Sequence, residues 1–145
     1  MLKYKDMEND KYKVLIIDDD KFLLDIYTVK FKENGLVVDT AIGGEEALEK
    51  LRENKNYDIL LLDIVMPVMD GFAFLEKKKA ENLAPKAVIV ILSNQGQASD
   101  IDKAKKYGIH GYIVKASTIP SEVLKEVLSI AKENISKLSN LKSPQ

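Results

Sequence analysis

The sequence predicts an α/β protein in which five parallel strands form one doubly wound sheet with helices on both faces. The first observation is a set of apolar runs without polar alternation, which is typical of strands buried on both faces. These runs are Val14–Ile17, Ile59–Leu62, Val88–Leu92 and Tyr112–Val114. The second is that amphipathic segments of helical spacing separate the runs. Strands that alternate with helices favour parallel β-α units.

Each predicted element has its own local signals. Asp20 is an expected N-cap for the first helix, and Gly35 is its expected stop. The weakest strand, Leu36–Thr40, follows the turn signal Asn34-Gly35. Three further helices are predicted around Ala47–Leu51, after Asp70-Gly71, and around Ile101–Tyr107 before Gly108. The last helix opens at Ser117–Pro120, where a proline in the first turn loses no hydrogen bond, and keeps helical spacing as far as Leu138.

Length and composition exclude several classes of protein. At 145 residues the chain is expected to form one domain. The absence of cysteine excludes a disulfide scaffold, a cysteine-based zinc site and a thiol nucleophile. The single histidine excludes a histidine-rich metal centre. With 22 basic and 23 acidic residues, the formal net charge of −1 argues against nucleic-acid binding.

Nothing in the sequence indicates a membrane segment. No apolar run reaches the roughly 18–20 residues that span a bilayer. The first ten residues are charged throughout and lack the apolar core of a signal peptide. We therefore expect a cytoplasmic protein with no membrane association.

The residues that end the predicted strands carry the chemistry, because ligands of open parallel sheets bind at the carboxyl ends of the strands. Those residues are Asp18-Asp19-Asp20, Asp63, Ser93-Asn94 and Lys115. Carboxylates would repel one another there without a counter-ion. Oxygen ligands select a hard cation, and few protein ligands favour Mg²⁺ over a full Ca²⁺ cage. A carboxylate nucleophile, a cation, a lysine and a hydroxyl are the parts needed for phosphoryl transfer to an aspartate.

Each of these residues also has a plainer interpretation when taken alone. Asp20 is equally well an N-cap, Ser93 the start of a loop, and Lys115 a solvated charge at a strand end. Their position at the ends of different strands favours the combined site. His110 has no second histidine or acidic ligand pattern near it, and it is interpreted as part of a surface loop.

Three motifs in this sequence resemble the receiver domain of two-component response regulators. They are Val14-Leu15-Ile16-Ile17-Asp18-Asp19-Asp20, the block Leu60-Leu61-Leu62-Asp63-Ile64-Val65-Met66-Pro67-Val68-Met69-Asp70-Gly71, and Gly111-Tyr112-Ile113-Val114-Lys115. The resemblance implies the flavodoxin-like (βα)5 receiver fold over residues 13–134. Residues 1–12 would be an N-terminal extension, and residues 135–145 a helical extension or tail.

The resemblance implies roles for individual residues. Asp63 would be the phosphoacceptor, supplied by a sensor histidine kinase or a histidine phosphotransfer protein. Asp18 and Asp19 would hold Mg²⁺, or Mn²⁺ in its place, together with Asp63 and the main-chain carbonyl of Val65. Lys115 would pair with a phosphoryl oxygen.

Two further positions match the switch of the family. Ser93 would hydrogen-bond another phosphoryl oxygen after an inward shift, and Tyr112 would turn inward as Ser93 moves. The protein would then be a signalling switch that controls a downstream protein effector, and a homodimer would form through the predicted fourth helix, fifth strand and last helix. It would not be an enzyme with a separate substrate, because it catalyses only its own phosphorylation and dephosphorylation.

Two departures and two alternatives remain. Ala116 follows Lys115 where the family usually has proline, and Asn94 follows Ser93 where a small residue is usual. A pseudo-receiver that binds partners through its fold alone is one alternative, although the acidic residues, Ser93 and Lys115 argue against it. An aspartyl-phosphate phosphohydrolase is the other; the pair Asp18-x-Asp20 resembles such enzymes, but Phe22 departs from their pattern.

Overall fold

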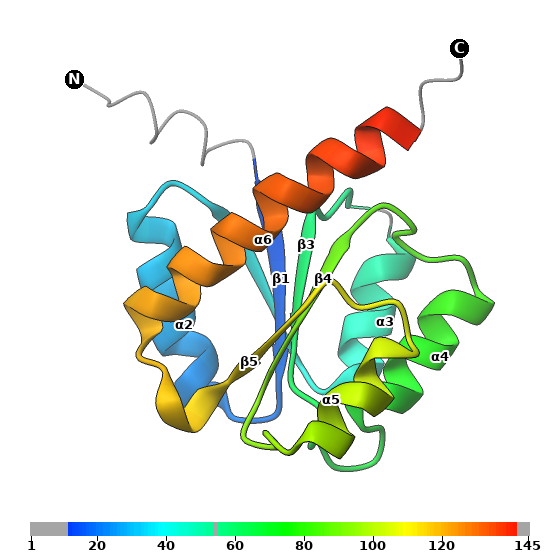
Figure 1. Ribbon diagram of the computed structural model, residues 1–145, viewed down its shortest axis with the longest axis horizontal. Helices are drawn as coiled ribbons and strands as arrows, with labels where there is room; N and C mark the ends of the chain where they lie inside the picture. Colours follow the sequence, from blue (N-terminus) through cyan, green and yellow to red (C-terminus); the bar gives the residue numbers. More distant parts are fainter. Residues whose placement is uncertain (1–11, 54, 142–145) are drawn as a thin grey trace.

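The computed structural model describes residues 12–53 and 55–141, and it confirms the predicted alternation of strands and helices. The elements follow one another from the N-terminus to the C-terminus (Figure 1). They are β1 (Lys13–Asp18), α2 (Lys21–Glu33), β2 (Val37–Ile42), α3 (Gly44–Arg52), β3 (Ile59–Leu62), α4 (Gly71–Ala80), β4 (Val88–Ser93), α5 (Ala98–Lys105), β5 (Gly111–Val114), a 3-10 turn (Lys115–Ser117) and α6 (Pro120–Leu141).

The strands form one parallel sheet in the order β2-β1-β3-β4-β5. The order reverses beside β1, where the chain moves to the other half of the sheet. This is the topological switch point at which open α/β sheets bind ligands. The three central strands are buried along almost their whole length, as expected for runs without polar alternation.

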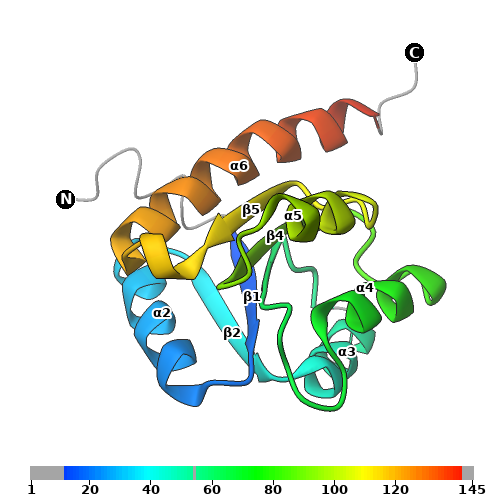
Figure 2. The same ribbon diagram turned by 60° about the horizontal axis from the view of Figure 1, so that its bottom comes forward.

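Helices cover the sheet on both faces, α2 and α6 on one and α3, α4 and α5 on the other (Figures 1 and 2). Alternate residues of each central strand point into opposite layers. Val14 and Ile16 pack with Phe31 of α2 and Val127 of α6, whereas Leu15, Ile17 and their neighbours pack with Leu48 of α3 and Phe74 of α4. The doubly wound architecture predicted from the sequence is confirmed.

The ends of α2 follow from its predicted cap and stop signals. The Asp20 carboxylate accepts hydrogen bonds from the N–H groups of Phe22 and Leu23, at 2.9 and 3.3 Å. After the helix ends at Glu33, Gly35 adopts φ = 89°, a left-handed conformation that glycine tolerates without strain.

Two local expectations differ in part from the structure. Strand β2 begins at Val37 and continues to Ile42, because it pairs with β1 over that strand's full length, from Lys13↔Val37 to Asp18↔Ile42. His110 lies in the loop before β5, as predicted, but it is half-buried there and its Nδ1 accepts a hydrogen bond from the Ile89 N–H at 2.9 Å. No helix within the described ranges is long and apolar enough to cross a membrane.

Candidate functional site

Sheet register places Asp18 and Asp63 side by side at the carboxyl edge. Ile17 pairs with Leu62, so the next residue on each strand is an aspartate, and the Asp63 N–H donates to the Ile17 carbonyl at 3.0 Å. Both side chains are buried, with only 3% of Asp18 and 6% of Asp63 exposed. Two adjacent carboxylates in such surroundings need cationic compensation.

Lys115 supplies part of that compensation. Its Nζ lies 2.8 Å from Asp18 Oδ2 and 3.2 Å from Asp63 Oδ2, so the ammonium bridges the two carboxylates. The bridge joins the end of β5 to the ends of β1 and β3, across the intervening strand β4. The Lys115 side chain is only 11% exposed, so solvent screens its attraction to the two carboxylates weakly.

Burial and neighbouring charges have opposite effects on the pKa values of Asp63 and Lys115. Burial raises the pKa of Asp63, and the neighbouring Lys115 offsets part of that rise. For Lys115, burial lowers the pKa, but the carboxylates of Asp18 and Asp63 together outweigh burial and leave the pKa raised. The lysine is therefore held in its charged form, while Asp63 is a stronger base than an exposed aspartate.

Asp19 completes a set of oxygen ligands. Carboxylate oxygens of Asp18, Asp19 and Asp63 lie within 4.8 Å of one another, and Asp19 is exposed to solvent. Against these three carboxylates the described chain provides one bridging ammonium, Lys115. Two negative charges remain, and the donors are all oxygens, which fits a divalent hard cation such as Mg²⁺. Asp20, by contrast, is occupied as the N-cap of α2.

The loop after Asp63 is fixed by close main-chain packing. The Val65 N–H donates to Asp63 Oδ1 at 3.4 Å, while the Val65 side chain is exposed. Gly71, the first residue of α4, lies so near that a Cβ there would be 2.7 Å from the Asp63 carbonyl oxygen. Asp70 caps the helix by accepting a hydrogen bond from the Ala73 N–H at 2.8 Å. The start of α4 is therefore packed directly against the residue that carries the candidate nucleophile.

Ser93 and Tyr112 lie beside this cluster on β4 and β5. Ser93 pairs in register with Val114, the residue before Lys115, and is fully buried. Its Oγ accepts a hydrogen bond from the Gln95 N–H at 3.3 Å. The half-buried Tyr112 donates its hydroxyl hydrogen to the Gln95 carbonyl oxygen. Asn94 is exposed, and the peptide bonds of the described chain, including Lys115–Ala116, are trans.

The structure thus brings Asp18, Asp19, Asp63 and Lys115 into one cluster, with Val65, Ser93 and Tyr112 on adjoining segments. The sequence carries no signal for the main-chain groups of Gln95, which serve both Ser93 and Tyr112. A main-chain donor or acceptor belongs to every residue, so only the folded loop reveals it.

Fold and site together define a doubly wound α/β domain with an acidic, lysine-bridged cluster at the carboxyl edge of its sheet. The family model for the response regulator receiver domain matches residues 14–128. The chain therefore belongs to the response regulator receiver domain family. This family is a signalling domain and not a classical enzyme; its members bind Mg²⁺ at an acidic pocket and interact with histidine kinases and output effectors.

Solved structures of the family share the fold. The chemotaxis protein CheY4 of Vibrio cholerae is 28% identical with a TM-score of 0.75, over 82% of this chain and 98% of that one. A CheY-like receiver domain protein from Methanospirillum hungatei is 26% identical with a TM-score of 0.76, over 87% and 98% of the two chains. TrrA of Thermotoga maritima, solved in complex with Mg(2+)-BeF, is 27% identical with a TM-score of 0.68, over 83% and 98%.

The curated relatives are longer than this chain. The probable transcriptional regulator ycf27 of Porphyra purpurea is 31% identical over 95% of this chain and 55% of its own length. The probable transcriptional regulator ycf29 of the same organism is 27% identical over 90% of this chain and 62% of its own length. The chain thus spans about half to three fifths of the length of these relatives.

Proposed function

We propose that this chain receives a phosphoryl group on Asp63 from a sensor histidine kinase or a histidine phosphotransfer protein, and that it passes the resulting conformational change to a downstream effector. The observation that carries the proposal is the pair of buried carboxylates bridged by Lys115. Such an arrangement is poorly compensated as it stands. It is better suited to a state in which a divalent cation enters the cluster and offsets both the carboxylates and the negative charge of a transferred phosphoryl group.

The transfer is a displacement at phosphorus. One Oδ atom of Asp63 forms a bond to phosphorus while the bond from phosphorus to the donor's imidazole nitrogen breaks. The imidazole leaves with the electron pair and takes up a proton. Burial keeps Asp63 basic and therefore nucleophilic, and Lys115, already 3.2 Å from Asp63 Oδ2, pairs with an oxygen of the incoming group. Hydrolysis later returns Asp63 to the carboxylate and releases inorganic phosphate.

The cation site fits this role. Asp18, Asp19, Asp63 and the main-chain carbonyl of Val65 would hold Mg²⁺ or Mn²⁺, consistent with the three converging carboxylates. When bound, the cation offsets the negative charge that gathers on the transferring group. Lys115 orients Asp63 through its bond to Oδ2.

Ser93 and Tyr112 are proposed as the switch. Ser93 Oγ accepts a hydrogen bond from the Gln95 N–H and also hydrogen-bonds the Tyr112 side chain; after transfer its hydrogen would be donated to a phosphoryl oxygen instead. A shift of Ser93 towards Asp63 would break the bond from Gln95, whose carbonyl also holds the Tyr112 hydroxyl. Both bonds pass through one residue, so the new anion would change the β4–α5 loop and the Tyr112 ring together.

The phosphodonor is proposed to dock on exposed apolar side chains that surround the site. Phe22 follows the acidic cluster at the start of α2, Val65 and Val68 follow Asp63, and Ile119 precedes α6. Their exposed fractions are 71%, 55%, 102% and 60%. We propose that these side chains form the apolar part of the surface that the donor contacts. A homodimer through α5, β5 and α6, a receiver boundary at 13–134 and a cytoplasmic location remain predictions.

The first experiment is the intact mass of the protein after incubation with Mg²⁺ and a small-molecule phosphodonor. We expect the gain of one phosphoryl group in the wild type and none in Asp63→Asn. Asp70→Asn is the matched control, because it changes another aspartate of the same loop while an asparagine still caps α4. Its phosphorylation should equal that of the wild type.

The alternatives give different results in the same assay. If neither the wild type nor a Mn²⁺-loaded sample gains a phosphoryl group, even on rapid quenching, the chain acts as a pseudo-receiver. Continuous release of phosphate from an added phosphate ester at many turnovers per molecule would instead indicate a phosphohydrolase.

A further inference from the structure

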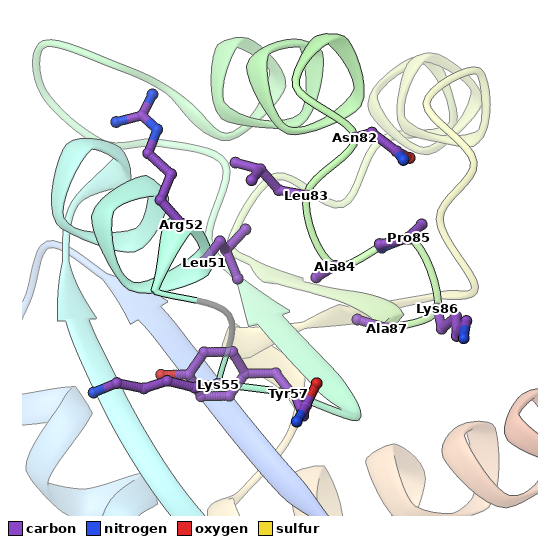
Figure 3. Close-up of a pocket in the computed structure, with 11 residues that line it drawn as sticks. Leu51, Arg52, Lys55, Tyr57, Asn82, Leu83, Ala84, Pro85, Lys86 and Ala87 are labelled. Carbon is purple, nitrogen blue, oxygen red and sulfur yellow. The ribbon is translucent and has the colours of Figure 1, made fainter.

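Two pockets lie at the amino-terminal end of the sheet, away from Asp63, on either side of the segment 82–87. The first, of about 340 Å³, lies between the end of α3 and this segment (Figure 3). The second, of about 280 Å³, lies between the same segment, the end of α4 and residues 107–110. In Figure 3, Leu83 points across the first pocket towards Leu51, whereas Asn82 lies on the opposite side of the segment.

The polar groups of the first pocket already have partners. Arg52 donates two hydrogen bonds to Glu81, at 2.8 and 2.7 Å. The Tyr57 hydroxyl donates to Asp39 Oδ2 at 2.6 Å. The guanidinium and the hydroxyl group of this pocket thus have partners within the chain. The first pocket therefore gives no evidence for a bound ligand.

The second pocket contains a lysine in a different situation. Lys78 lines it and is only 9% exposed, yet it has no hydrogen bond or ion pair within the described parts of the chain. Glu81, one turn further along, is the nearest acidic residue in sequence on its C-terminal side, and it is committed to Arg52. Within the described residues Thr28 Oγ1 is the buried side-chain polar atom without a partner, so the unpaired Lys78 ammonium keeps contact with solvent while the aliphatic part of the side chain is buried. The ammonium therefore faces the open space of the pocket with no carboxylate beside it.

Other groups of the second pocket add donors of the same kind. His110 Nδ1 accepts a hydrogen bond from the Ile89 N–H, so the ring hydrogen of the neutral histidine resides on Nε2 and can be donated. Lys79 and Asn82 also line the pocket, and no aspartate or glutamate does. Burial lowers the pKa of Lys78; burial and, secondarily, Lys78 lower the pKa of His110.

The rest of the lining is apolar, with Leu75 and Tyr107 from the helices and Ile89 from β4. The adjoining segment holds two non-glycine residues with positive φ, Asn82 at 53° and Ala84 at 42°. Asparagine adopts this conformation readily, whereas at Ala84 it is strained and persists because the surrounding structure holds it.

We propose that this pocket binds a small organic oxyanion, a carboxylate or a phosphate-type monoester with an apolar substituent. The oxyanion would lie against Lys78 and His110, with Asn82 beside it, and the substituent against Leu75, Ile89 and Tyr107. This site is separate from the acidic cluster at Asp63 and has the opposite charge. It assigns a function to a buried lysine that phosphoryl transfer does not use.

The test is a titration of the isotope-labelled full chain, without divalent cation, with benzoate, benzamide and phenylphosphonate. Phenylphosphonate carries the phosphate-type charge on a carbon–phosphorus bond, so it cannot phosphorylate Asp63. We expect at least one of the two anions to shift the amide resonances of Lys78, Ile89 and His110 saturably and to raise the melting temperature. Comparison of the two anions tells carboxylate from phosphate chemistry, and neutral benzamide should have little effect.

Two variants on adjacent positions make the assignment specific. Lys78→Met keeps the length of the side chain and removes its charge, and should weaken anion binding by about tenfold, the effect of one charge-assisted hydrogen bond. Lys77→Met, on the exposed side of α4, should leave binding unchanged. The proposal is overturned if neither anion produces saturable shifts, if benzamide binds as well as benzoate, or if Lys78→Met binds as the wild type does. Phosphorylation of Lys78→Met on Asp63 would verify that this variant is folded.

Discussion

Gly71 lies against the main chain of Asp63, so that a Cβ at position 71 would fall 2.7 Å from the Asp63 carbonyl oxygen and 2.8 Å from Ile64 Cα. Main-chain atoms cannot rotate away as a side chain can. The first turn of α4 thus packs directly against the main chain of Asp63, the candidate phosphoacceptor. Glycine is required here for the closeness of the approach.

We expect Gly71→Ala to lower the free energy of unfolding by about 1–3 kcal/mol, the usual cost of overpacking, and to slow phosphorylation of Asp63. Gly44→Ala is the matched control, since Gly44 is also the first residue of a helix but faces the flexible side chain of Met69. That variant should change stability by less than about 1 kcal/mol. Urea denaturation of both variants measures the difference, and equal losses would contradict the role assigned to the Asp63 main chain.

Asp19→Asn should weaken Mg²⁺ binding by on the order of tenfold, which corresponds to about 1.4 kcal/mol. The reason is that Asp19 is one of three converging carboxylates and its charge would be lost. Asp20→Asn is the control on the neighbouring residue, because asparagine is as good an N-cap as aspartate. Calorimetric titration should separate the two variants; if Asp19→Asn binds Mg²⁺ as the wild type does, Asp19 is not a ligand.

Ser93→Ala should weaken the conformational response more than it weakens phosphoryl uptake, because the hydroxyl hydrogen-bonds the phosphoryl group only after the group has been transferred to Asp63. We would record the shift of the Tyr112 amide resonance per phosphorylated molecule, with the extent of phosphorylation taken from intact mass. Ser99→Ala, an exposed serine in α5, serves as the control. An unchanged Tyr112 shift in phosphorylated Ser93→Ala would show that the serine does not transmit the signal.

Phe22→Ala should slow phosphoryl transfer from a histidine phosphotransfer protein while uptake from a small-molecule donor stays unchanged. The Phe22 side chain is 71% exposed and so contributes little to the core, but it lies at the start of α2 beside the acidic cluster. Val37→Ala, which truncates an exposed apolar residue on the edge strand β2, is the control. Equal slowing with both kinds of donor would place the effect on the chemistry and not on docking.

The stability of the protein should decrease as the pH falls below about 6.5, the ordinary pKa of histidine, in part because of His110. Burial, and then the charge of Lys78, lower the pKa of His110 in the folded protein. The unfolded chain therefore binds the proton first, and the loss is complete once the pH has passed below the folded pKa. His110→Asn retains an acceptor for the Ile89 N–H and should flatten this part of the pH profile. A profile unchanged by the substitution would exclude His110 as its source.

The fold could be predicted because its signals are local and repeated. Ile59–Leu62 forms the strand that its unbroken apolar run indicates, and Asp20 caps α2 as its position suggests. The acidic cluster could also be predicted from the sequence, since parallel strands bring their final residues to one edge of the sheet. His110 lies in the predicted loop, but its partial burial could not be predicted, because its partner is a main-chain N–H on another strand. The burial of Lys78 depends on how α4 packs against residues 107–110, and no pattern within α4 itself indicates it.

Strand β5 connects two residues that have opposite surroundings. His110 precedes it and Lys115 follows it, a separation of about 17 Å at the rise of an extended strand. All four strand residues between them are registered against β4, from Val90↔Gly111 to Ser93↔Val114. A paired strand cannot slip gradually, because the smallest shift that keeps its side chains on the same faces is two residues. The distance from His110 to Lys115 is thus fixed by the strand. It provides a constant reference distance against which the movement of the neighbouring loops can be measured.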